Sequence, residues 1–124
     1  MAKTILVVDD SGTMLLSLKN NLEIAGFTVV TACDGVRGMQ KLADGPKPDL
    51  IITDINMPNM NGIEFIGNVR TTPGFRFTPI LVLTTESQQA RRDEAKKLGA
   101  TGWMVKPVAG ADLLKIVRQV LPGA

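Results

Sequence analysis

The sequence contains no histidine and only one cysteine. Without imidazole, the chain has no general base of the Ser-His-Asp or Cys-His type and no histidine metal ligand. A single thiol, Cys33, excludes an internal disulfide and any multi-cysteine zinc site. Any bound metal is therefore expected to be a hard cation held by oxygen atoms, and a lone thiol fits a reducing compartment.

The sequence also lacks a marked excess of charge of one sign and any long hydrophobic run. The 14 basic and 12 acidic residues give a net charge of +2, which argues against partners such as nucleic acid or an anionic membrane surface. Apolar runs such as Ile5–Val8 and Ile80–Leu83 are far shorter than the roughly 20 residues of a membrane span. The amino end does not resemble a signal peptide. We therefore expect a cytoplasmic protein that does not insert into membranes.

What the chain does contain is a regular alternation of two patterns within 124 residues, a length typical of one domain. Short apolar, β-branched runs occur at Ile5–Val8, Phe27–Val30, Leu50–Ile52, Ile80–Leu83 and Trp103–Val105. Segments with helical spacing follow them, at residues 12–25, 35–42, 63–69, 87–98 and 113–120. Strands that are apolar throughout indicate a sheet covered on both faces. The pattern predicts an α/β fold with a parallel sheet, as one domain over residues 1–124.

Acidic residues stand at the ends of two of these strands. Asp9 and Asp10 follow the first strand, and Asp54 follows the third. The carboxyl ends of parallel strands share one edge, where open α/β sheets bind their ligands. Three carboxylates that converge there repel one another and raise at least one pKa, a conflict that a divalent cation removes. Magnesium suits such a site because it combines carboxylates with water and phosphate oxygens.

A plainer interpretation exists for each acid alone. Asp10 or Ser11 can cap a helix that begins at Gly12. Asp54 precedes a segment rich in Asn, Pro and Gly, where an Asp is most often a turn residue. Because acids follow two different strands of one predicted sheet, we favour a cation-binding site over the capping and turn roles.

The last two strands end in further polar residues. The fourth strand leads into Thr84 and Thr85, and the fifth leads into Lys106 and Pro107. A hydroxyl and an ammonium would thus join the three carboxylates at one edge. Together with magnesium, these groups are suited to holding a phosphoryl group.

With Asp-Asp, Asp, Thr and Lys in that order at strand ends, the sequence resembles the receiver domain of two-component response regulators. It is most similar to single-domain chemotaxis regulators of the CheY type. The similarity covers the whole chain and is densest in ILVVDD, PDLIITDINMPNMNG, ILVLTTES and GATGWMVKP. It implies a doubly wound, flavodoxin-like fold with five parallel strands in the order 2-1-3-4-5, five helices and no output domain.

The resemblance also implies roles for individual residues. Asp54 corresponds to the phosphoacceptor, Thr84 to the hydroxyl that moves toward the phosphoryl group, and Lys106 to the lysine that pairs with it. The metal would be Mg²⁺, with Mn²⁺ as an alternative, and its protein ligands would be Asp9, Asp10, Asp54 and the backbone carbonyl of Asn56.

Four positions are expected to tune the switch. Trp103 stands where the family usually has Tyr or Phe, and Thr85 where a smaller residue is commoner. Glu86, like Asn56, flanks the site and matches the CheY type. Pro107 follows Lys106 in a peptide bond that is typically cis in this family.

The partners that the resemblance implies are proteins. A histidine kinase or a histidine phosphotransfer domain would supply the histidine that this chain lacks. The signal would pass to a flagellar motor switch or another signalling protein, through the fourth helix, fifth strand and fifth helix, where Gln88, Arg92, Trp103, Met104 and Lys115 are expected. The chain would not be an enzyme beyond its own phosphorylation and dephosphorylation.

Other functions remain open at this point. A stand-alone receiver in a phosphorelay outside chemotaxis fits the same residues. An aspartate-nucleophile phosphatase of the haloacid dehalogenase type is suggested by LVVDDSGT, but Ser11 replaces the second Asp of that pattern, and only Asp112 follows Lys106. A scaffold that does not depend on phosphate is disfavoured by the intact set of site residues.

Overall fold

Five parallel strands form the centre of the structure, a computed structural model in which residues 2–121 are described. Met1 and residues 122–124, which the predicted domain includes, lie outside the described residues. The strands are β1 (Thr4–Val8), β2 (Thr28–Ala32), β3 (Leu50–Thr53), β4 (Ile80–Thr84) and β5 (Gly102–Val105). Their order in the sheet is β2-β1-β3-β4-β5, with every neighbouring pair parallel, as the family resemblance implied.

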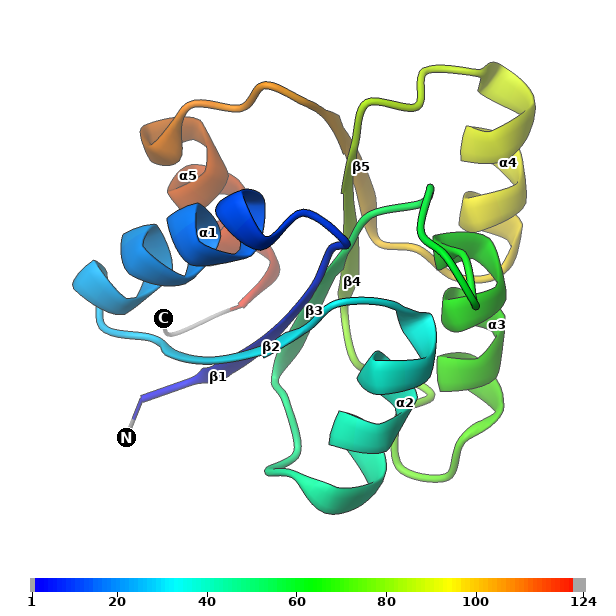
Figure 1. Ribbon diagram of the computed structural model, residues 1–124, viewed down its shortest axis with the longest axis horizontal. Coiled ribbons are helices and arrows are strands. Elements are labelled where there is room, and N and C mark those ends of the chain that lie inside the picture. Colours follow the sequence, from blue (N-terminus) through cyan, green and yellow to red (C-terminus); the bar gives the residue numbers. More distant parts are fainter. Residues whose placement is uncertain (1, 122–124) are drawn as a thin grey trace.

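Helices cover both faces of this sheet (Figure 1). On one face lie α1 (Gly12–Ile24) and α5 (Gly110–Val120), and on the other lie α2 (Gly35–Asp44), α3 (Gly62–Thr71) and α4 (Gln89–Lys97). The predicted doubly wound α/β fold is therefore confirmed. Among the described residues, no helix has the length and apolar character that crossing a membrane requires.

The two faces of the sheet have separate hydrophobic cores because successive strand residues point to opposite sides. In β1, Ile5 and Val7 pack with α1 and α5, whereas Leu6 and Val8 pack with α2 and α3. All four side chains are buried. This explains why the strands lack polar alternation: a sheet covered on both faces gives neither set of side chains access to water.

The boundaries of several elements differ from the sequence predictions. The second strand covers Thr28–Ala32 rather than Phe27–Val30. Gly26 ends the preceding helix with a positive φ of 99°, and the amide of Phe27 donates back to the carbonyl of Leu22, so the strand begins one residue later. The fourth helix covers Gln89–Lys97, within the predicted segment 87–98.

Helix α1 begins where the sequence predicted, and the structure decides which residue caps it. Ser11 is the N-cap, and its side chain accepts a hydrogen bond of 3.2 Å from the N–H of Met14. Asp10 does not take this position. The carboxylate of Asp10 is thus left at the sheet edge rather than tied to the helix.

Candidate functional site

The strand register brings the predicted acids together at the carboxyl edge of the sheet. Val8 of β1 pairs with Thr53 of β3, so the residues that follow, Asp9 and Asp54, are neighbours. The backbone agrees, because the N–H of Asp54 donates to the carbonyl of Val8 at 2.9 Å. Asp9, Asp10 and Asp54 each offer a carboxylate oxygen, and these oxygens lie within 4.8 Å of one another. The expected convergence is therefore observed.

Lys106 reaches into this group from the end of β5. Its Nζ donates to Asp9 Oδ2 at 2.7 Å and to Asp54 Oδ2 at 3.0 Å. Its backbone N–H donates to the carbonyl of Thr84 at 2.8 Å, which fixes the start of the β5–α5 loop. The Lys106–Pro107 peptide is cis, as expected. The ammonium thus bridges the carboxylates of two strands.

Two opposing effects act on the pKa values of the site: burial, and the pairing of Lys106 with the carboxylates. The pKa of Asp9 is raised because burial disfavours the carboxylate, and the hydrogen bonds from Lys106 and the Ser11 N–H offset only part of that effect. Burial by itself would lower the pKa of Lys106, but its bonds to Asp9 and Asp54 outweigh that effect and raise it. Three carboxylates and one ammonium leave a formal charge of −2.

The donor set fits a divalent cation that prefers oxygen. Asp10 is exposed and presents its carboxylate to solvent, while Asp9 and Asp54 are buried behind it. Asp9 Oδ1 accepts from the Ser11 N–H at 2.9 Å and Asp54 Oδ1 from the Ile55 N–H at 2.6 Å, so both carboxylates are held in place by the backbone. Asn56, the other predicted ligand, is exposed and directly follows Asp54 and Ile55 in the sequence.

Thr84 is fully buried at the end of β4. Its hydroxyl oxygen accepts a hydrogen bond of 3.1 Å from the N–H of Glu86, so it is directed toward the β4–α4 loop. Thr85 is exposed between them. The Glu86 carboxylate lies 4.0 Å from Arg91 Nε, which connects the loop to the first part of α4.

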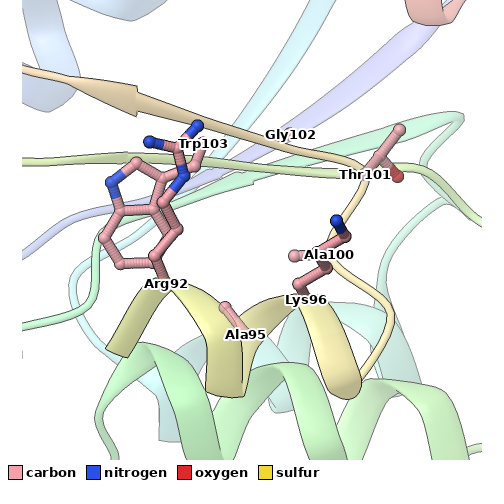
Figure 2. A pocket seen from close by; sticks show the side chains of 7 residues that line it. All are labelled: Arg92, Ala95, Lys96, Ala100, Thr101, Gly102 and Trp103. Atoms are coloured by element: carbon pink, nitrogen blue, oxygen red, sulfur yellow. The ribbon is translucent and has the colours of Figure 1, made fainter. Parts of the chain in front are cut away.

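Trp103 lines a pocket to which none of the three carboxylates contributes. It is half-buried on β5, and this pocket of about 220 Å³ lies between the strand and α4. Figure 2 labels the residues that line it, with Arg92 and Lys96 from α4 among them. The residue therefore belongs to the α4 side of the sheet, and its ring packs against that core.

Two residues near the site were not singled out by the sequence interpretation. Asp34, which directly precedes the predicted helical segment at residues 35–42, is buried and accepts a hydrogen bond of 2.8 Å from Asn59 Nδ2. Asn59 belongs to the loop that carries Asn56. A possible signal was the Asp34-Gly35 pair, but it is equally typical of a helix N-cap.

Comparison with known proteins agrees with this arrangement. Residues 5–118 match the family model described as response regulator receiver domain. Chemotaxis protein CheY1 of Helicobacter pylori is 40% identical over 118 residues, which cover 94% of this chain and 95% of that protein. The transcriptional regulatory protein PhoP of Bacillus subtilis is 36% identical over 98% of this chain, but the chain spans only 49% of its length.

A solved structure extends the similarity to three dimensions. Chemotaxis protein CheY4 of Vibrio cholerae superimposes with a TM-score of 0.92 at 42% identity, covering 98% of this chain and 100% of that one. The family model, the relatives and the fold agree with one another, and the haloacid dehalogenase alternative has no support among them. This chain belongs to the family of response regulator receiver domains.

Proposed function

We propose that this receiver domain is a phosphorylation-operated switch in which Asp54 accepts the phosphoryl group. The observation that carries the proposal is the position of Lys106 Nζ, which bridges Asp54 Oδ2 at 3.0 Å and Asp9 Oδ2 at 2.7 Å within a cluster that Asp10 completes. An incoming phosphoryl group at Asp54 thus meets the ammonium of Lys106 and, when a cation is bound to the carboxylates, a second positive charge.

The reaction would be an in-line displacement. An oxygen of the Asp54 carboxylate attacks phosphorus and the bond from phosphorus to the donor nitrogen breaks; the donor ring, which carries a proton on its other nitrogen beforehand, takes the electron pair and leaves as neutral imidazole. Lys106 turns from the carboxylates toward the new phosphoryl oxygens. Water later cleaves the mixed anhydride and restores the free carboxylate, which makes the signal transient.

The acidic cluster would hold Mg²⁺, with Mn²⁺ as an alternative, through Asp9, Asp10, Asp54 and the Asn56 carbonyl. When bound, the cation neutralises charge on the transferring phosphoryl oxygens. The formal charge of −2 at the cluster supports this role, because the bare site repels a phosphate anion. A solved relative at 25% identity, Rcp1, is described as the Mn²⁺-bound form of a response regulator.

Phosphorylation would be read out through Thr84 and the α4–β5 side of the fold. The Thr84 hydroxyl leaves the N–H of Glu86 and donates to the phosphoryl group, which releases the β4–α4 loop. The loop leads into α4, and α4 shares a pocket with Trp103. The resulting change in α4, β5 and α5 would alter binding to a downstream protein.

A histidine kinase or histidine phosphotransfer domain is the proposed donor, in the cytoplasm. The proposal includes chemotaxis, with a flagellar motor switch or another signalling protein as target, because relatives of equal length such as CheY1 are chemotaxis proteins. A stand-alone receiver in another phosphorelay is the alternative. The chain also spans about half the length of the longer transcriptional regulator PhoP.

The phosphoacceptor is tested by incubating the protein with acetyl phosphate and magnesium and measuring intact mass. We expect one phosphoryl group on the wild type, none on Asp54→Asn, and wild-type labelling on Asp93→Asn, a control at an exposed acid on α4. Chelation of magnesium should stop the labelling. Persistent labelling of Asp54→Asn would place the reaction on another carboxylate.

The assignment to chemotaxis needs a test in the native host. The gene is deleted, and the reversal frequency of swimming cells is recorded before and after complementation with the wild type or with Asp54→Asn. Restoration by the wild type alone supports chemotaxis. Unchanged swimming in the deletion strain supports the phosphorelay alternative.

A further inference from the structure

The β3–α3 loop, residues 54–61, contains both Asp54 and Asn56 and must hold their oxygens in a fixed relation. Its first part is held by the backbone, because the N–H of Gly62 donates to the carbonyl of Ile55 at 2.8 Å. An added Cβ at Gly62 would lie 2.0 Å from the carbonyl oxygen of Asp54, so only glycine permits this close approach. This tether lies just before Asn56.

A second tether lies just after Asn56 and comes from a different part of the chain. Asn59 Nδ2 donates to Asp34 Oδ2 at 2.8 Å, across 25 residues of sequence. Beside it, the N–H of Gly35 donates to the carbonyl of Met60 at a longer 3.3 Å. Asn59 itself has a φ of 68°, a left-handed conformation that asparagine adopts more readily than most residues. Asn56 therefore lies between two residues, Ile55 and Asn59, that hydrogen bonds hold in place.

Asp34 uses its two carboxylate oxygens for two different elements. Oδ1 accepts from the N–H of Arg37 at 2.8 Å and caps α2, while Oδ2 holds Asn59. The residue is only 6% exposed, and its pKa is lowered by the hydrogen bond from Arg37 and then by that from Asn59. An ionised carboxylate thus links a rigid helix start to the middle of the loop.

We infer that Asp34 and Asn59 form a latch that positions the β3–α3 loop for metal binding. We call this hydrogen bond the Asp34–Asn59 latch, and both members act as positioning residues that touch no bound group themselves. The latch limits how far the Asn56 carbonyl can move from the carboxylates of Asp54 and Asp10. The inference rests on the proposed function, since it concerns the same cation site.

The latch is tested with two variants that leave the proposed ligands unchanged. Asp34→Ser keeps an oxygen that can cap α2 but is too short to reach Asn59. Asn59→Gly removes the amide and preserves the freedom to adopt a positive φ. Asp49→Ser is the matched control, because Asp49 Oδ2 accepts from the N–H of Thr4 at 2.8 Å at the opposite edge of the sheet.

Magnesium affinity of the metal-free proteins is measured by titration calorimetry, and the melting temperature is measured in chelator. We expect each latch variant to raise the Kd for Mg²⁺ about fivefold, somewhat less than outer-shell changes that touch a ligand directly. The double variant should show the same Kd as either single one, because both remove one bond. Asp49→Ser should lower the melting temperature but leave the Kd unchanged.

The outcomes separate this inference from the proposed function. If the wild type binds no Mg²⁺, the proposed metal site itself fails. If the wild type binds Mg²⁺ and both latch variants bind it within twofold, the latch is only structural and the inference is overturned. Independent effects that multiply in the double variant would also overturn it. Should Asp34→Ser not fold, Asn59→Gly still decides the question, because Asn59 is exposed and caps no helix.

Discussion

Lys106 Nζ lies 2.7 Å from Asp9 Oδ2, in a contact where the ammonium side chain is only 12% exposed and the carboxylate side chain 3%. The same ammonium lies 3.0 Å from Asp54 Oδ2, so one lysine partly neutralises carboxylates that follow two different strands. In the proposed switch, a divalent cation and Lys106 share the carboxylate of Asp9. The affinity of the metal and the stability of the metal-free fold are therefore coupled through this lysine.

Replacement of Lys106 by Met should have opposite effects on stability and on metal binding. The free energy of unfolding without metal should fall by about 2 kcal/mol, less than for a fully buried pair, because Asp9 and Asp54 lose their partner. Affinity for Mg²⁺ should rise about fivefold or more, since a positive charge leaves the site. Urea denaturation and calorimetry measure the two effects. A variant with weaker Mg²⁺ binding would contradict the shared-carboxylate interpretation.

Asp10→Asn should stabilise the metal-free protein. Asp10 is exposed, has no contact with Lys106 and adds a third negative charge to the cluster. Removing that charge should add about 1 kcal/mol, which corresponds to a rise in Tm of about 4 °C for a domain of this size. Millimolar Mg²⁺ should then stabilise the wild type more than the variant. Asp93→Asn serves as the control, and an equal rise in its Tm would mean that clustering is not the cause.

Trp103 should report the activated state through its fluorescence, since it is the only tryptophan. Beryllofluoride with magnesium, as a stand-in for the phosphoryl group, should shift the emission maximum. Thr84→Val should remove most of that shift, because the hydroxyl bonded to the Glu86 N–H is the group that the proposed switch moves. Fluorine NMR establishes that beryllofluoride occupies the site in both proteins. Unchanged emission at full occupancy would make Trp103 a static packing residue.

The contribution of Asp34 to stability should depend on pH in a defined direction. Its pKa in the folded state is lowered from 3.8, so the ionised form stabilises the fold above that value and the contribution is lost as pH falls below it. The difference in unfolding free energy between wild type and Asp34→Ser should therefore be about 1 kcal/mol near pH 6 and smaller near pH 3. Urea denaturation at both values measures it. A difference that does not change with pH would show that the charge of Asp34 is unimportant.

Much of the fold was predictable because local patterns encode it. Apolar runs such as Ile5–Val8 and helical spacing such as Ile63, Ile66 and Val69 correspond to buried strand and helix residues. Errors occurred at boundaries, as at Phe27, where an apolar residue belongs to the turn after α1 and packs in the core without pairing in the sheet. Hydrophobicity alone does not distinguish these two positions.

The sequence allowed us to predict which residues come together in the candidate site. It did not allow us to predict the individual contacts among them. Strand ends on a parallel sheet share an edge, which was enough to place Asp9, Asp54 and Lys106 together. Side-chain rotamers and loop paths decide which oxygen of each carboxylate faces Lys106. They also decide that Thr84 faces the backbone of Glu86. No local pattern specifies those.

The amino-acid sequence was enough to predict the alternation of strands and helices, the burial of both sheet faces and the presence of acids, a hydroxyl and an ammonium at strand ends. These follow from periodicity and from polar residues at the limits of apolar runs, which are properties of short segments. The exact register of β1 against β3, the bridge from Lys106 to two carboxylates and the Asp34–Asn59 latch became known only from the three-dimensional structure. Those contacts join segments that are distant in the chain, and their geometry arises from strand register and loop closure, which depend on the packing of the whole domain.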